Sequence, residues 1–401
     1  MKEIPSDIIL KLNQEAEEKI KYDPSIINGT IGMLFNDDRH LAFDEIISNL
    51  ISNHNKEKDL VYSTVTGTNE YKTAIYKWFI KDYTSISMDE FKFISTPGGT
   101  GACSISIHDT LKDNNSVLII PDISWPNYLT IASLNNIEVY KYKNYDGDNF
   151  NIKDIESYID KNHLCKKISI LINDPCQNPT GYAIKEYEWN EIIRIIKKYN
   201  LNNNISLILD LAYFDYASFN EKKNLFNAIE ILKDYVNIYI CFSFSKTFSM
   251  YGLRLGALAM LLKDNKEEIF KKACLTARGL WSNVNHLGMN VVSDIVNDEK
   301  TLLNVRSMIE DNIKLVKNRA GIFLKEAKEV NLKYYPYDSG FFITIPVKDS
   351  LSIIEELKKE KIYIVPINLT TIRVSLSCIP TKDIYSLAKK IKIAVEKIEN
   401  D

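Results

Sequence analysis

Along much of this chain, short apolar runs rich in β-branched residues alternate with amphipathic helical patterns. The runs that we expect to form strands cover 117–121, 137–142, 168–173, 206–210, 236–243 and 257–262. The helical patterns cover 70–81, 101–112, 186–199, 266–274 and 303–327. Strands that alternate with helices are typical of parallel sheets, because each helix carries the chain back across the sheet. This order therefore predicts an α/β domain with a largely parallel sheet.

The C-terminal part of the chain has a different pattern. Strand-like runs cover 334–347, 362–366 and 371–376, and helical patterns cover 351–360 and 382–398. This part predicts a separate, smaller α+β domain. The 401 residues are enough for one large and one small domain.

Composition narrows the possible functions. The net charge is −3, so we expect no nucleic-acid partner. Six scattered cysteines without a CxxC pair and five histidines without ligand spacing predict neither a disulfide framework nor a metal site. The N-terminus lacks the apolar core of a signal peptide, and no apolar run approaches the ~20 residues that span a bilayer. We therefore expect a soluble, cytoplasmic protein without a membrane partner.

The stretch SFSKTFSMYGLRLG, at 243–256, follows one of the expected strands. It places Lys246 beside Ser243 and Ser245, and it places Arg254 between two glycines. Hydroxyls, an arginine and closely approaching glycine backbone are groups that bind phosphate. A lysine beside such groups can attach covalently to a phosphorylated aldehyde. The stretch therefore predicts a pyridoxal phosphate (PLP) site with Lys246 as the point of attachment.

Three further polar residues lie at or just beyond the ends of expected strands: Asn178, Asp210 and Tyr213. Ligands of open parallel sheets bind outside the carboxyl ends of the strands, so these side chains should converge with Lys246. We expect Asp210 to pair with the protonated ring nitrogen, which preserves the electron sink of the cofactor. We expect Asn178 and Tyr213 to reach its phenolic oxygen. Taken singly, Asn178 also fits an ordinary turn and Asp210 a helix cap.

Other segments add candidate groups. The segment TPGGTGA places Gly99, Thr100 and Gly101 at an expected helix start, where exposed N–H groups bind phosphate. Trp125, in SWPNY, can stack on an aromatic cofactor, although core filling is the alternative. Arg373, in TIRVSLS, lies among apolar residues and needs a planar anion, which a substrate α-carboxylate provides. The alternative for Arg373 is an edge strand facing water.

These motifs occur in the same order in a known family. The chain resembles the fold-type I PLP enzymes, specifically the class I aminotransferases of the aspartate and aromatic amino-acid branch. The matching segments extend over most of the chain and are TPGGTGA, SWPNY, NPTG, DLAY, SFSKTFSMYGLRLG and IRVSLS. The resemblance implies the fold of that family. Residues 1–49 would form an N-terminal arm and part of the small domain, 50–300 the large PLP-binding domain, and 301–401 the C-terminal small domain.

The resemblance implies further site residues. Gly32, in NGTIG, resembles a glycine that lies over the substrate, which Trp125 and Asn178 are also expected to contact. Tyr62, in YSTVTG, resembles a tyrosine that reaches the phosphate from the neighbouring subunit. Arg278, in ARGLWSN, resembles an arginine that binds a substrate's distal carboxylate, again from the neighbour. The resemblance therefore implies a homodimer with shared active sites.

Two positions depart from the pattern of the aspartate enzymes. Where those enzymes typically carry a histidine three residues after Trp125, this chain has Tyr128. Before Asn-Pro-Thr-Gly it has Gln177 in place of a histidine. The core chemistry is unaffected, but the support of Asp210 and the substrate preference are left open.

We therefore expect an aminotransferase that works by a ping-pong mechanism. It would move the amino group between an L-amino acid (aspartate, glutamate or an aromatic one) and a 2-oxo acid such as 2-oxoglutarate, with Lys246, Asp210 and Tyr213 as the catalytic residues. One alternative is a PLP-dependent C–S lyase, which would gain little from Arg278. The other is a PLP-sensing regulator, for which no helix-turn-helix segment is found before residue 30.

Overall fold

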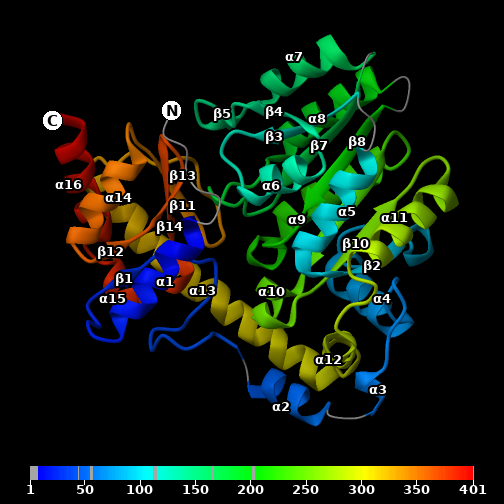
Figure 1. Ribbon diagram of the computed structural model, residues 1–401, viewed down its shortest axis with the longest axis horizontal. Helices are drawn as coiled ribbons and strands as arrows, with labels where there is room; N and C mark the ends of the chain where they lie inside the picture. The colour runs from blue at the N-terminus through cyan, green and yellow to red at the C-terminus, as the bar shows by residue number, and fades with distance from the viewer. Residues whose placement is uncertain are drawn as a thin grey trace.

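The computed structural model of the protein describes residues 8–43, 45–54, 57–111, 115–164, 166–200 and 204–400. Its largest element is a seven-stranded sheet (Figure 1). The strands, in order across the sheet, are β2 (Lys92–Pro97), β10 (Leu255–Leu261), β9 (Asn237–Ser243), β8 (Ile205–Asp210), β7 (Lys167–Asn173), β3 (Ser116–Pro121) and β4 (Glu138–Tyr142). Neighbours from β9 to β4 are parallel, whereas β10 is antiparallel to both β9 and β2. The predicted α/β class with a largely parallel sheet is therefore confirmed.

Helices cover both faces of this sheet (Figure 1). One face carries α5 (Gly98–Thr110), α6 (Asn127–Leu134) and α11 (Lys266–Leu280), and the other carries α4 (Asn69–Ile75), α7 (Ile152–Asn162), α8 (Glu186–Tyr199), α9 (Phe219–Leu232) and α12 (His286–Asn297). Successive strand residues point to opposite faces of the sheet. Leu171 and Ile208 therefore pack under α5, α6 and α11, whereas Ile170 and Leu209 pack under the helices of the other face. Because both faces are buried, the strands appear in the sequence as nearly continuous apolar runs.

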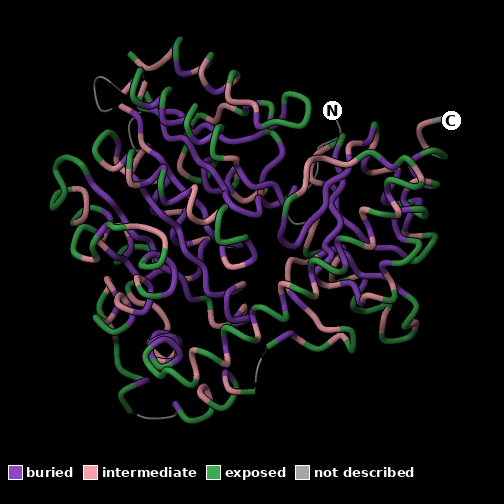
Figure 2. Tube along the Cα trace, turned by 180° about the vertical axis from the view of Figure 1, so that it is seen from behind, coloured by how far each residue is buried: buried purple, intermediate pink, exposed green. Residues whose placement is uncertain are grey.

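Both ends of the chain contribute to a second, smaller core. It contains a three-stranded antiparallel sheet of β11 (Phe342–Pro346), β14 (Thr371–Ser375) and β13 (Val365–Asn368), and a parallel pair of β1 (Ile27–Asn28) with β12 (Ile362–Tyr363). The helices α1 (Ile8–Ile20) and α14 (Ser350–Lys359) pack on these strands, and α16 (Leu387–Asn400) packs against α14 in the same core. Figure 2 shows the two cores as separate regions of buried chain.

The long helix α13 (Glu299–Glu329) joins the two cores. Val305 and Ile309 pack in the large core, whereas Ala320 and Phe323 pack in the small one. Side chains from the N-terminal segment, such as Leu12, lie in the same small core as the C-terminal strands. The division into domains at residues 49 and 300 remains a prediction. Helix α13 begins beside the second of these positions, and its first turns still pack in the large core.

The structure differs from the sequence-based expectations in several elements. The run 334–347 forms a strand only over β11, and 362–366 is divided between β12 and β13. Strand β2 and helices α1, α6, α7, α9 and α12 were not predicted. The 70–81 pattern is helical, but its second half is a π-helical turn, Tyr76–Ile80. The remaining short elements are α2 (Glu45–Asn53), α3 (Glu57–Leu60), β5 (Tyr145–Asp146), β6 (Asn149–Phe150), α10 (Phe244–Thr247) and α15 (Thr381–Ile384).

Two features are absent from the residue ranges that the structure describes. Within those ranges, no helix is both long enough and apolar enough to cross a bilayer. The same ranges contain no cluster of three or more histidine, cysteine or acidic side chains arranged to hold a metal ion.

Candidate active site

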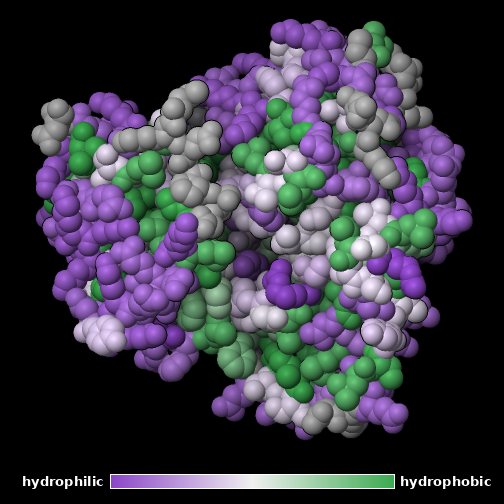
Figure 3. Space-filling view, viewed as in Figure 1, coloured by the Kyte–Doolittle hydropathy of each residue, from purple (hydrophilic) through white to green (hydrophobic). Residues whose placement is uncertain are grey.

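A cavity of about 230 Å³ lies at the carboxyl ends of the central strands, and Figure 3 shows the surface hollowed between the two parts of the molecule. Strands β7, β8 and β9 end there at Asn173, Asp210 and Ser243. The edge at which parallel strands end is where such sheets bind ligands. The cavity is lined by Gly99, Thr100, Trp125, Tyr128, Asn173, Asn178, Asp210, Ala212, Tyr213, Ser243, Ser245, Lys246 and Arg254.

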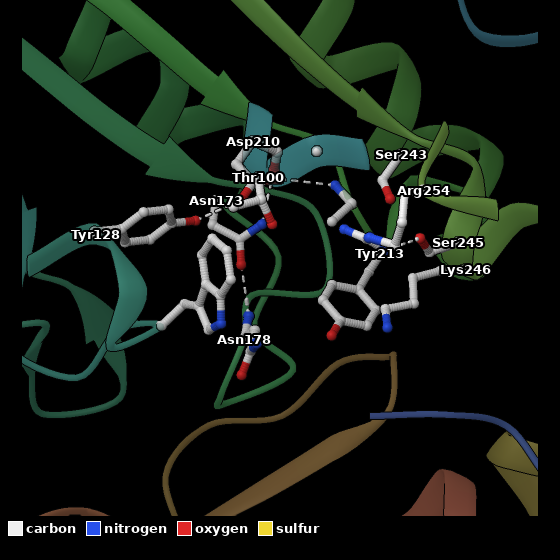
Figure 4. A pocket seen from close by; sticks show the side chains of 13 residues that line it. Thr100, Tyr128, Asn173, Asn178, Asp210, Tyr213, Ser243, Ser245, Lys246 and Arg254 are labelled. Carbon is white, nitrogen blue, oxygen red and sulfur yellow. Dashed lines mark hydrogen bonds between the residues drawn. The ribbon is translucent and has the colours of Figure 1, made fainter. Parts of the chain in front are cut away.

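Most of the residues predicted to contact a cofactor line this one cavity (Figure 4). Lys246 lies with Arg254 and its neighbouring serines at one side, and Asp210 lies with Tyr128 at the other. Gly101 is an exception. It is buried in α5, where an added Cβ would lie 2.5 Å from Cδ of Pro97, so its backbone permits the helix to pack against the end of β2.

Lys246 lies in the short helix α10, directly after β9. Its Nζ donates a hydrogen bond to the carbonyl oxygen of Gly32 at 2.7 Å and lies 5.8 Å from the ring centre of Tyr213. Burial, followed by the positive charges of Arg254 and Arg373, lowers the pKa of Lys246 to about 7. The amine is therefore available as a neutral base near pH 7.

Asp210 is the last residue of β8 and is almost completely buried. Its Oδ2 accepts a hydrogen bond from the hydroxyl of Tyr128 at 2.6 Å, and its Oδ1 accepts one from the backbone N–H of Ala212 at 3.0 Å. Burial raises the pKa of Asp210, while these two bonds and one from the Cys103 thiol oppose the rise. A buried carboxylate of this kind is costly unless it meets a cation, and the cavity leaves room for one.

Arg254 occupies the end of the cavity nearest the start of α5. Its Nη1 donates to the hydroxyl of Ser245 at 3.2 Å, and its backbone adopts the left-handed conformation, with φ at 52°. Gly98, with φ at 71°, has no room for a side chain, because an added Cβ would lie 2.6 Å from Nη2 of Arg254. The helix start, the hydroxyls and the guanidinium together form a cradle for a phosphate group.

Arg373 lies on β14, in the small core's sheet, and reaches toward the cavity from the opposite side. It is 3% exposed, and it donates to the side-chain oxygen of Asn178 at 3.2 Å and to the backbone carbonyl of Thr30 at 2.5 Å. Its Nε has no hydrogen-bond partner among the described residues. An added Cβ on Gly32 would lie 2.7 Å from the ring of Phe342 and 3.2 Å from the hydroxyl of Tyr213, so this position has no room for a side chain.

The two residues expected to act across an interface are exposed and do not line the cavity. Tyr62 is 92% exposed, and Arg278 lies at the exposed end of α11. The side chain of Asn283 forms hydrogen bonds with both the backbone and the hydroxyl of Ser63. The segment that contains Tyr62 and the segment that contains Arg278 therefore lie on one side of the molecule. Hydrophobic side chains gather over α3 and α12 near the first of these segments (Figure 3).

Sequence reasoning assigned no role to several residues that line the cavity. Tyr128 was noted only as a departure from a family pattern. Asn173 accepts the backbone N–H of Asn178 at 2.7 Å and donates to the backbone carbonyl of Asp210 at 2.7 Å, so it links two of the predicted residues. Its position at the end of a predicted strand was the signal that could have identified it.

Comparison with known proteins gives a consistent result. The sequence model of the class I and II aminotransferases matches residues 25–391. The aromatic-amino-acid aminotransferase of Escherichia coli (strain K12) is 25% identical over 81% of this chain and 84% of its own length. The mitochondrial aspartate aminotransferase of Saccharomyces cerevisiae is 27% identical over 63% of each chain. The crystal structure of an aminotransferase from Anaerococcus prevotii has a TM-score of 0.91 and 26% identity, covering 98% of this chain and 97% of that one.

The cavity fits the cofactor on which this family depends. The cradle at Arg254 suits a phosphate, the buried carboxylate of Asp210 suits a protonated ring nitrogen, and the amine of Lys246 suits an aldehyde. The family match covers nearly the whole chain, including every one of these residues. The chain therefore belongs to the class I and II aminotransferase family and is a PLP-dependent aminotransferase.

Proposed function

We propose that this aminotransferase moves the amino group of an acidic or aromatic L-amino acid to a 2-oxo acid such as 2-oxoglutarate, by a ping-pong mechanism. The observation that carries the proposal is the convergence of Lys246, Asp210 and Arg254 on one cavity, with Arg373 facing it from the small core. The similarity to aromatic-amino-acid and aspartate aminotransferases supports the same choice of substrates.

One group of residues would hold the phosphate of the cofactor. Arg254, Ser243, Ser245 and the N–H groups of Gly99 and Thr100 would bind its phosphate, with Gly101 admitting the close approach of the helix. When bound, the cofactor supplies an aldehyde for covalent attachment and a cationic ring that withdraws electrons from the substrate Cα.

The ring of the cofactor would be held by other residues. Asp210 would pair with its nitrogen, Asn178 and Tyr213 would donate to its phenolic oxygen, and Trp125 would stack on its face. The pKa of Tyr213 is raised by burial, so its hydroxyl remains a donor at neutral pH. Trp125 and Asn178 would also contact the substrate.

The substrate would be oriented and deprotonated by the chain's own side chains. Arg373 would bind the α-carboxylate, and its Nε, which has no partner among the described residues, is available for a two-pronged contact. Gly32 would leave space for the substrate above Lys246. The neutral amine of Lys246 would take the proton from Cα and return it to C4′ of the cofactor, and a lowered pKa suits it to both steps.

We propose a homodimer in which Tyr62 and Arg278 complete the neighbour's site. Their exposure on one subunit and the exposed apolar residues around them support this, namely Leu60, Val61, Leu275 and Leu280. Tyr62 would reach the phosphate, and Arg278 would bind a distal carboxylate. We also propose a cytoplasmic location, which the free state of all the described cysteines supports.

Borohydride reduction tests the site assignment. It should fix the cofactor to the protein, and peptide mapping should find the label on Lys246. Lys246→Ala should lose both the label and at least the ~10²–10⁴-fold rate contribution of general acid–base catalysis. A label on another lysine would remove Lys246 from the proposal.

Two arginine variants test the substrate class. Arg278→Ala should lower kcat/KM for glutamate and aspartate by roughly 30- to 1000-fold, because a substrate carboxylate loses its charged partner, and should spare aromatic amino acids. Arg373→Ala should lower it for every substrate, because all carry the α-carboxylate. Equal losses for acidic and aromatic substrates in the Arg278 variant would favour a general aromatic or neutral aminotransferase.

A further inference from the structure

Tyr128 has an unusual position in the cavity. It lies in the first turn of α6, is 1% exposed, and donates its hydroxyl to Oδ2 of Asp210 at 2.6 Å. Its ring meets the indole of Trp125 edge-on, with 5.2 Å between ring centres and 90° between the planes. None of the side chains that line the cavity in the described ranges is a histidine.

We propose that Tyr128 is a positioning residue, which holds the carboxylate of Asp210 ionised and in one orientation toward the ring nitrogen of the cofactor. The inference rests on the proposed pairing of Asp210 with that nitrogen. It assigns to Tyr128 the support of Asp210 that the sequence left open.

The geometry of the donors supports this role. The two oxygens of Asp210 are held by different parts of the fold, Oδ2 by the hydroxyl of Tyr128 and Oδ1 by the N–H of Ala212. With both oxygens bound, the carboxylate cannot rotate about its side-chain bond without losing a hydrogen bond. A third donor, the thiol of Cys103 from α5, also faces it.

The donors stay protonated over the working range of the enzyme. Burial, followed by the nearby charge of Asp210, raises the pKa of Tyr128 well above its usual range. A hydrogen bond with Cys241, followed by burial, raises the pKa of Cys103. Burial likewise raises the pKa of Tyr213, another titratable group that lines the cavity with Asp210. Tyr128, Cys103 and Tyr213 therefore keep their protons at pH 6–8, the range in which the ordinary pKa of a histidine lies.

This arrangement separates two functions within the cavity. The free amine of Lys246 has a pKa of about 7, whereas the pKa of Tyr128 is raised well above its usual range, so the support of Asp210 does not change near pH 7. The ring nitrogen should therefore stay protonated across the range in which Lys246 titrates. A buried phenol also donates without adding a charge, so the carboxylate is stabilised while its cationic partner remains the cofactor.

The test uses the holoenzyme loaded with PLP labelled with ¹⁵N in the ring, and it follows the ¹⁵N chemical shift by NMR. Tyr128→Phe removes only the hydroxyl and keeps the ring against Trp125. The matched control is Tyr140→Phe on strand β4, which removes a tyrosine hydroxyl that donates to Asp154 at 2.7 Å. Asp210→Asn provides the reference shift for a ring without its carboxylate partner.

The wild type and Tyr140→Phe should give the shift of a protonated ring, unchanged from pH 6 to pH 8. Tyr128→Phe should move it toward that of Asp210→Asn and lower kcat by about 10- to 100-fold, the factor that a hydrogen bond to a charged group contributes. Cys103→Ala, which removes a weaker donor from another helix, should move the shift less in the same direction. This variant keeps the test informative should Tyr128→Phe fail to fold.

Two results would overturn the inference, and they are distinguishable. An unchanged ¹⁵N shift in the folded Tyr128→Phe enzyme, beside a changed one in Asp210→Asn, would show that Asp210 pairs with the ring but needs no positioning by Tyr128. An unchanged shift in Asp210→Asn would show that Asp210 does not pair with the ring nitrogen. That second result would remove both the proposed role of Asp210 and the inference built on it.

Discussion

At the scale of single residues, the electrostatics of Lys246 follow from where the fold places it. Burial and the positive charges of Arg254 and Arg373 all disfavour its ammonium form, so all of them lower its pKa. A lysine with a lowered pKa is charged below that value and neutral above it. In the cofactor-free protein the amine should therefore become reactive near pH 7 instead of near 10.5.

Competitive acylation of the cofactor-free protein checks this expectation. The rate of labelling at Lys246, followed by mass spectrometry, should rise with pH through a midpoint of about 7. A lysine-containing model peptide in the same reaction serves as the control, and its labelling should still be rising well above that pH. Arg373→Met should move the midpoint of Lys246 upward, because it removes one of the two positive charges. A midpoint for Lys246 near that of the model peptide would show that the amine is not desolvated.

At the scale of elements, the buried cation of Arg319 ties α13 to the parts of the chain that surround the small core. Arg319 is completely buried, and its guanidinium donates to the carboxylate of Asp37 at 2.8 Å and to the carbonyl oxygen of Ser377 at 2.9 Å. It therefore ties α13 both to the N-terminal segment and to the turn after β14. Removing one member of such a set leaves buried acceptors without a donor.

Arg319→Met should lower the free energy of unfolding by about 2–4 kcal/mol, since it strands buried acceptors while keeping most of the side-chain volume. Chemical denaturation of the holoenzyme measures this. The matched control on the same helix is Lys314→Met, which breaks an exposed pair with Asp311 and should change stability by less than about 0.5 kcal/mol. Equal effects of the two substitutions would contradict the role of Arg319.

At the scale of the whole molecule, the proposed dimer with shared sites predicts the activity of mixed subunits. Lys246→Ala and Arg278→Ala subunits, each weak alone with an acidic substrate, should regain activity when unfolded together and refolded. Half of the dimers should then be hybrids with one intact site, which gives about a quarter of wild-type activity. Mixing Lys246→Ala with Asp210→Asn is the control, because both residues belong to one subunit's cavity and no intact site can form. No recovery in the first mixture would contradict sharing of Arg278.

The sequence was informative about the large sheet and its polar edge for a local reason. Buried parallel strands have nearly continuous apolar runs, and Asp210 and Lys246 follow such runs directly. The rule that ligands bind where parallel strands end then brought Asn178, Asp210 and Lys246 to one edge without further information. The resemblance to a family added Gly32, Tyr62 and Arg278, which no local pattern singles out.

The sequence predicted the small core less accurately, because its strands pair with segments that are distant in the sequence. Ile27 lies opposite Ile362 in the β1–β12 pair, and neither the two-residue length of these strands nor their partner can be read from a local window. Strand β10 is antiparallel to both of its neighbours, β9 and β2. This direction likewise depends on how the chain returns to the sheet, which a local window does not show. Helix α12 packs against α4 across more than 200 residues of sequence, and it was missed for the same reason.

By itself, the sequence determined the class of fold, the polar residues at the ends of the central strands, and the phosphate-binding groups beside Lys246. These depend on periodicity and on motifs a few residues long. Only the tertiary structure decided that Tyr128 donates to Asp210 from 82 residues away and that Arg373 reaches Asn178 across 195. Such contacts depend on the relative positions of whole elements. Those positions follow from packing between distant surfaces, which no local pattern encodes.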